Sequence, residues 1–480
     1  MAKKRKDLQV DLSSTSSFGE LFQAELNKLC DFEAPDPVLC STGSSLLDTI
    51  IGGGLSTGKY HVFAAPAHSG KSTTCIRTIA KFLEDHQDGI VLWIDGEQAS
   101  PPLRLMQLGI PFVHAKDKDG QDIVDPKTGF LPKLNSKGDI VWDNRFFRVP
   151  NNITLETAFE LVEKCIQIKI QTGTESNPML VVFDSLDSLP SQKELESDSA
   201  DNAIGQKSKV LGFYMKKFLF KIMQYNICMV FICHIGKKLS LQGPYESYDG
   251  RMSSLKDFTV AGGKAIQFYP SNMIFYRSRI TKQTDDLLAK MGIPAGFLVE
   301  ATTLKAKSFS SNLVVPLIFN ALKGFDEYPT RFYNMNAFGW FKGSAWKTLP
   351  EYPDDKFQVS TFMERVESDP QFKEKVDISW KNYLDVTYSK YNRIMSTLND
   401  IHQSMDIDSF NESDTQKVMH DFLSEAINQE VADDPLSNQA EFQEESDSIN
   451  IPEVSDDPEE SDDGLGQLFT DTVNTYLPEE

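Results

Sequence analysis

Residues 65–72 decide the fold of this chain; they read Ala65-Pro66-Ala67-His68-Ser69-Gly70-Lys71-Ser72. The apolar run 60–64 before them predicts a buried strand, and residues 73–82 after them predict a helix. A phosphate-binding P-loop requires this strand–loop–helix order, because its backbone N–H groups and a helix N-terminus must point at the phosphates. A chance Gly-Lys-Ser turn would not explain the flanking strand and helix.

The residue types in this loop match the parts of a nucleotide. Lys71 is expected to reach the β- and γ-phosphates, and the Ser72 hydroxyl to ligate Mg²⁺. The remaining loop residues, up to Thr73 in the helix, would cradle the phosphates with their backbone. Ala65 stands where the motif usually has glycine, which is a mild departure.

Composition excludes several classes of protein. A chain of 480 residues can form two or three domains, and no run of eighteen apolar residues predicts a membrane span. The basic run Lys3-Lys4-Arg5-Lys6 is not followed by an apolar stretch, so it does not predict a secretory signal. A solvated tail is the preferred interpretation, and a nuclear-localisation signal is the alternative. The six cysteines form no CxxC pair, which indicates a reducing, cytoplasmic setting without a zinc site.

The negative charge is concentrated at one end of the chain. The formal net charge is −22, but residues 430–480 contain 17 acidic and no basic residues. The other 429 residues therefore carry only −5, so the overall charge does not exclude a DNA-binding site.

Periodicity divides the chain into four parts. Residues 1–37 are a polar tail with an amphipathic oligomerisation helix at 18–30. Residues 38–330 alternate strand and helix patterns around a lysine- and aspartate-rich insertion at 113–146, which predicts a hairpin or loop. Residues 331–430 predict a small α-rich domain, and 431–480 a disordered acidic tail. The expected fold is α/β, with a mainly parallel twisted sheet. Its candidate strands are 59–65, 90–95, 179–184, 227–234, 271–277 and 297–304.

Three predicted strands end in side chains that suit nucleotide hydrolysis. Asp184 follows the buried run 180–183 and is expected to support Mg²⁺. Glu97 follows another strand and could activate water, although acids at strand ends often only cap the next helix. His234 ends a third strand; a core histidine competes with a role in sensing the γ-phosphate, but ligands bind at this edge of such sheets.

These positions, in this order and spacing, resemble the RecA family of DNA recombinases, and its phage UvsX-type members in particular. The resemblance covers about 38–330. Further segments that carry it are Ser41-Thr42-Gly43-Ser44-Ser45-Leu46-Leu47-Asp48, Ile94-Asp95-Gly96-Glu97, Asp184-Ser185-Leu186, Ala261-Gly262-Gly263-Lys264-Ala265 and Leu304-Lys305-Ala306-Lys307. It implies a RecA-like ATPase core in a helical filament on single-stranded DNA, where it exchanges strands with duplex DNA in recombination and repair.

The resemblance also implies roles for single residues. Lys305 and Lys307 would reach the ATP of a neighbouring subunit, His234 would act as an allosteric switch, and Gly262-Gly263 would close the second DNA loop. Arg104 stands where the family usually has a tyrosine that stacks on adenine. A guanidinium can also stack on a base, but the departure leaves the nucleotide preference open.

Two regions predict contacts with DNA. The loop 235–262 carries Lys237, Lys238 and Arg251 among aromatic residues, a composition suited to phosphates and bases. A helix at 204–223 has an apolar stripe of Leu211, Met215, Phe218 and Ile222. Lys209 and Lys216 lie opposite this stripe and align with basic DNA-backbone positions of the family. An ordinary surface loop and a solvated lysine face are the alternatives. The first DNA loop, near 189–204, is acidic and predicts no basic contact.

Two other functions compete with this prediction. A ring-forming replicative helicase shares a similar core, but it predicts a large N-terminal domain where this sequence has about 37 residues before the core. In a regulatory ATPase switch, the basic loop would contact a protein. The acidic tail could compete with DNA or bind a mediator or single-strand-binding protein. The expected location is a bacterial or phage-infected cell, at the nucleoid.

Overall fold

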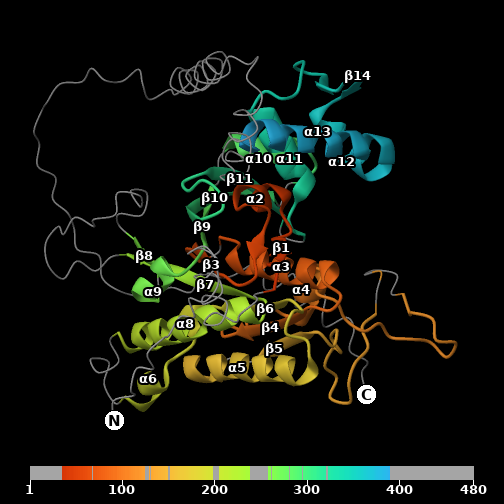
Figure 1. Ribbon diagram of the computed structural model, residues 1–480. Helices are drawn as coiled ribbons and strands as arrows, with labels where there is room; N and C mark the ends of the chain where they lie inside the picture. The colour runs from red at the N-terminus through yellow and green to blue at the C-terminus, as the bar shows by residue number, and fades with distance from the viewer. Residues whose placement is uncertain are drawn as a thin grey trace, which may run out of the picture. The chain divides into compact units, whose positions relative to one another are not determined.

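The computed structural model describes residues 35–389, except 68, 125–128, 130, 150–151, 198–204, 238–257, 261, 280–281, 294–295 and 321–322 (Figure 1). All described residues belong to the first of two units, Met1–Met405 and Asp406–Glu480. The predicted helix at 18–30 and the acidic tail at 431–480 lie outside the described residues.

A mostly parallel sheet forms the centre of the described part, which confirms the predicted α/β class. Six neighbouring strands run parallel, and every candidate strand of the sequence appears within two or three residues of its expected ends. In spatial order the six are β9 (Asn272–Arg279), β3 (Tyr60–Ala65), β7 (Ile227–Lys237), β6 (Met179–Asp184), β4 (Ile90–Asp95) and β5 (Phe146–Val149).

Antiparallel strands extend this sheet beyond β9. They are β10 (Gly296–Ala306), β11 (Val314–Asn320) and β12 (Gly324–Phe325), while β8 (Phe258–Val260) pairs with β7. The sequence predicted β10 but not its direction, and it missed β11, where Pro316 interrupts an apolar run and lowers strand propensity. It also missed β5, which begins at Phe146, the last residue of the predicted insertion.

Two layers of helices cover the two faces of the sheet (Figure 1). Alternate residues of β3 point to opposite faces: Phe63 packs in one apolar cluster with α3 (Lys71–Asp85), and Val62 in another with α5 (Leu155–Thr172) and α8 (Gln206–Gln224). The stripe predicted for α8 is confirmed, since Leu211, Met215, Phe218 and Ile222 are all fully buried.

Elements after residue 326 pack on the same apolar cluster as α3. They are α11 (Glu327–Ala337), β13 (Lys347–Leu349), β14 (Tyr352–Phe357), α12 (Val359–Ser368) and α13 (Pro370–Tyr388). Trp380 on α13 donates its indole N–H to the Ser45 Oγ at 2.8 Å, on helix α2 (Ser45–Ile50). The domain boundary predicted at 330 falls inside α11.

The segment 113–146 consists largely of extended chain. Isolated antiparallel bridges join Phe112 to Trp142, His114 to Pro132 and Leu134 to Ile140, in keeping with the predicted hairpin or loop. Within the described residues, no helix is both long and apolar enough to cross a membrane.

His61 makes the stability of this fold depend on pH. It is fully buried in β3, and its Nε2 lies 2.9 Å from the Ser56 carbonyl oxygen. Burial lowers its pKa from 6.5 to about 4, so the unfolded chain binds a proton between these values and the folded chain does not. We expect the free energy of unfolding to fall by on the order of 3 kcal/mol as the pH drops from 6.5 to 4. Denaturant titrations of wild type and His61→Gln should show this slope only in wild type; equal slopes would contradict it.

Candidate nucleotide site

The strand register brings three of the predicted site residues, Ala65, Asp184 and His234, to one edge of the sheet. Ala65, the last residue of β3, pairs with His234 on β7, and Asp95 at the end of β4 pairs with Asp184 at the end of β6. All four strands are parallel, so their carboxyl ends face the same way. This is the edge at which doubly wound sheets bind ligands.

Residues 66–70 join β3 to α3, so the strand–loop–helix order that the sequence predicts for a P-loop is present. Gly70 adopts a left-handed conformation with φ +82°, and a Cβ there would lie 2.6 Å from the Phe319 ring on β11. Ser69 and Lys71 are buried, whereas Pro66 and Ala67 are exposed. His68 lies outside the described residues. Phe319 therefore closes the back of the loop, a contact between positions 249 residues apart that no local pattern signals.

Ser72 and Asp184 lie close enough to share a cation. The Ser72 hydroxyl donates to Asp184 Oδ1 at 3.2 Å. Burial, with the neighbouring charges of Glu97 and Asp95, raises the pKa of Asp184 to about 7. A partly buried hydroxyl beside a buried carboxylate suits Mg²⁺, which binds few protein oxygens and keeps water or phosphate as its other ligands. Within the described residues no three His, Cys, Asp or Glu side chains gather as a complete metal site.

Glu97 lies at the mouth of this site and contacts His234. The His234 Nε2 and the Glu97 Oε1 are 2.9 Å apart, and both side chains are about one-third exposed. Burial alone would raise the pKa of Glu97, but the nearby Ser185 hydroxyl, His234 and Lys71 outweigh it and lower that pKa. An ionised carboxylate beside the phosphate loop can accept a proton from water.

Asp95 and Arg148 hold the turn that carries Glu97. Asp95 is 2 % exposed; its Oδ1 accepts the Gln98 N–H at 2.9 Å, and its Oδ2 accepts two hydrogen bonds from the Arg148 guanidinium. The same guanidinium donates to the Ser100 carbonyl and lies 5.0 Å from the Trp93 ring centre. The sequence pattern predicts no role for Asp95 or Arg148. An acid at a strand end was the only signal, and its partner is 53 residues away.

A hydrogen bond connects His234 to the start of α8. The His234 N–H donates to Asp187 Oδ2 at 2.7 Å, and Lys207 on α8 donates to the Asp187 carbonyl oxygen at 2.8 Å. Movement of His234 can therefore reach α8 through one residue.

Lys305 and Lys307 lie at the opposite edge of the sheet from the P-loop. Ala306, between the two lysines, pairs with Asn272, the first residue of β9, and Asn272 pairs with His61, the second residue of β3. The Lys305 ammonium donates to the Phe268 carbonyl oxygen at 2.7 Å, and burial, together with the Lys307 charge, lowers its pKa. Lys307 is exposed. The chain does not bring these lysines to its own P-loop.

The predicted DNA residues are only partly described. Lys209 and Lys216 are exposed on α8. Gly262 and Gly263 begin helix α9 (Gly263–Phe268) at positive φ, and a Cβ on either would come within 3 Å of side chains on neighbouring elements. Lys237 ends β7, and nothing is described of its side chain. Lys238 and Arg251 lie outside the described residues.

Arg104 lies on the short helix α4 (Pro102–Gln107), beyond the Glu97 turn. It is partly buried, and burial lowers its pKa.

Comparison with known proteins identifies relatives but no complete match. No family model matches the chain. Proteins named "Protein RecA" are 25 % identical over 231 residues in Synechococcus elongatus and over 248 residues in Nostoc sp. strain PCC 7120, and 24 % identical over 268 residues in Prochlorococcus marinus strain MIT 9515. These matches cover 48, 51 and 56 % of this chain and 50, 55 and 58 % of the respective relatives. The chain thus spans about half the length of the curated relatives it matches, and this similarity supports a relationship to the RecA-family recombinases.

Proposed function

We propose that this protein is an ATP-dependent DNA strand-exchange protein that works as a filament on single-stranded DNA. The observation that carries the proposal is the strand register: the P-loop lies at one edge of the sheet and Lys305 and Lys307 at the other. Copies stacked head to tail would bring the lysines of one subunit to the P-loop of the next, as a heterologous interface permits. Similarity to proteins named RecA supports this proposal. A closer relationship to the phage UvsX-type members of the family remains a prediction.

In this proposal each residue has a separate role in ATP hydrolysis, and the residues come from two adjacent subunits. Lys71 and the loop backbone hold the phosphates, and Ser72 with Asp184 would hold Mg²⁺, which neutralises phosphate charge when bound. Glu97 orients the attacking water and accepts its proton. Lys305 and Lys307 of the adjacent subunit stabilise charge that develops on the γ-phosphate.

The same geometry suggests how ATP could control DNA. His234 contacts Glu97 through its ring and Asp187 through its backbone, and Asp187 binds Lys207 at the start of α8. We infer that the state of the γ-phosphate reaches α8, whose exposed Lys209 and Lys216 would hold the DNA backbone. Lys237, Lys238, Arg251 and the Gly262-Gly263 turn would serve the second DNA loop.

Mixing two inactive variants tests the shared site. Lys71→Ala lacks a working P-loop, and Lys305→Ala/Lys307→Ala lacks the reaching lysines, so each alone should lose DNA-dependent ATP hydrolysis and strand exchange. In a mixture, some interfaces join an intact P-loop to intact lysines, and part of the activity should return. Steady-state ATP turnover with single-stranded DNA measures this.

Two controls separate the alternatives. Adding Lys71→Ala to the Lys305→Ala/Lys307→Ala chain puts every defect in one subunit, and mixing this chain with Lys71→Ala should restore nothing. Electron microscopy with an ATP analogue distinguishes an open filament from the closed ring of a helicase. A mixture without recovered activity would reject the shared site; strand exchange that survives Lys71→Ala would reject the function.

A further inference from the structure

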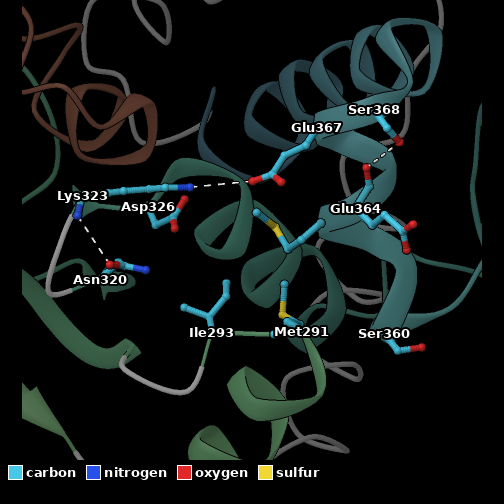
Figure 2. Close-up of a pocket in the computed structure, with 11 residues that line it drawn as sticks. Met291, Ile293, Asn320, Lys323, Asp326, Ser360, Glu364, Glu367 and Ser368 are labelled. Carbon is cyan, nitrogen blue, oxygen red and sulfur yellow. Dashed lines mark hydrogen bonds and ion pairs between the residues drawn. The ribbon is translucent and has the colours of Figure 1, made fainter. Parts of the chain in front are cut away.

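A cavity of about 520 Å³ lies away from the nucleotide site, between the turn after α10 (Lys282–Lys290), the β11–β12 turn and helix α12 (Figure 2). One side of the cavity lining is apolar and the other is acidic. Met291, Ile293 and Met363 give it an apolar side, and Asp326 and Glu367 give it an acidic side. Neither the proposed hydrolysis nor the proposed DNA contacts use these residues.

Asp326 is the feature of this cavity that needs an explanation. Its side chain is 7 % exposed and lines the cavity, and within the described residues no hydrogen bond or ion pair reaches its carboxylate. It occupies the N-cap position of α11 without capping that helix. Burial raises its pKa, and the Glu367 and Glu327 charges add to this while Lys323 opposes it. A largely buried carboxylate that no side chain pairs with is costly, and this one is left facing the cavity.

Lys323 lies on the acidic side of the cavity but pairs with Glu367 and not with Asp326. Lys323 reaches Glu367 at 3.7 Å, and both side chains are more than half exposed, which makes this a weak surface pair (Figure 2). Glu364 adds a third carboxylate to the lining. The cavity therefore has more negative than positive charge, with its most buried charge facing inward.

We infer that this cavity binds an alkylammonium or alkylguanidinium group. The cationic head would pair with Asp326, and the alkyl stem would lie against Met291, Ile293 and Met363, because thioethers adapt to flexible chains. A divalent metal fits less well, since no three metal-ligating side chains gather in the described part of the chain. Such a cationic group has two possible sources. One is a free polyamine; the other is the basic run Lys3-Lys4-Arg5-Lys6 of this chain, whose positive charge complements the acidic side of the cavity.

Isothermal titration of the full chain with agmatine and with spermidine, at constant ionic strength, tests the site. We expect wild type to bind and Asp326→Asn to bind at least about tenfold more weakly, since one charged pair is lost. Lys323→Met should bind more tightly than wild type because it removes an internal competitor for the acidic wall. Glu374→Gln, an exposed change on α13, is the matched control and should bind as wild type does.

A variant with Lys3, Lys4, Arg5 and Lys6 changed to alanine separates the two sources. If the chain's own basic run fills the cavity, this variant binds the probes more tightly than wild type; if a free amine is the ligand, the two bind alike. Both results support the site. Absence of binding to both proteins, or equal binding by Asp326→Asn, would overturn it.

Thermal unfolding without probe checks the premise. In the chain with Lys3, Lys4, Arg5 and Lys6 changed to alanine, Asp326→Asn removes a buried charge without a partner and keeps the shape of the side chain, so the unfolding midpoint should equal or exceed that of the same chain with Asp326. A clear fall would show that the carboxylate has a structural partner, and would also overturn the proposal.

Discussion

Glu97→Gln is expected to lower DNA-dependent ATP turnover by about 10²–10⁴-fold while ATP binding stays close to wild type, the usual contribution of a positioned general base. The amide keeps the size of the side chain and can still hydrogen-bond to His234, 2.9 Å away in the wild type, but it cannot accept a proton from water. Turnover with saturating single-stranded DNA, compared with nucleotide affinity from calorimetry, separates the chemical step from binding.

The matched control for this variant is Glu84→Gln. Glu84 is an exposed carboxylate on α3, the helix that follows the P-loop, and its ion pair with Lys81 is a surface contact. Its loss should leave turnover unchanged. Should Glu97→Gln keep more than a tenth of wild-type turnover, another group activates the water and the role given to Glu97 is wrong.

Arg148→Met is expected to destabilise the protein by about 3 kcal/mol, because it leaves the buried Asp95 carboxylate without its charged partner. The methionine fills much of the same space, so lost packing contributes little. The turn from Asp95 to Gln98 should loosen, and ATP turnover should fall because Glu97 lies on it. Denaturant unfolding measures the first effect and steady-state kinetics the second.

Two further variants test whether the unpaired charge of Asp95 causes the loss of stability in Arg148→Met. Adding Asp95→Asn to Arg148→Met removes the buried charge and should recover most of the lost stability. Arg279→Met breaks the more exposed ion pair with Glu300 and should cost less than about 1 kcal/mol. Equal losses in Arg148→Met and Arg279→Met would mean that burial of Asp95 does not matter.

Local patterns predicted the central sheet because its strands are short, continuous apolar runs next to clear turn signals. The stripe of α8 was predicted to the residue, since a helix buried on one face repeats its apolar positions every three to four residues. Strand β11 was not predicted because Pro316 interrupts its apolar run. The position of β11 in the sheet depends on its pairing with β10. That pairing joins residues 12 to 24 positions apart, which lies beyond the reach of a local apolar pattern.

In the candidate site, too, local sequence predicts some features and only the tertiary structure shows the others. The sequence alone determined the P-loop and the acids and histidine at three strand ends, because each is a local motif and parallel strands bring their ends to one edge. Only the tertiary structure decided what surrounds them: Phe319 against Gly70, Arg148 on Asp95, and Lys305 on the edge opposite the P-loop. It also decided that Asp326 is buried beside a cavity. These relationships depend on strand order and register, which arise when distant segments bury their apolar faces together, and no local stretch of sequence encodes them.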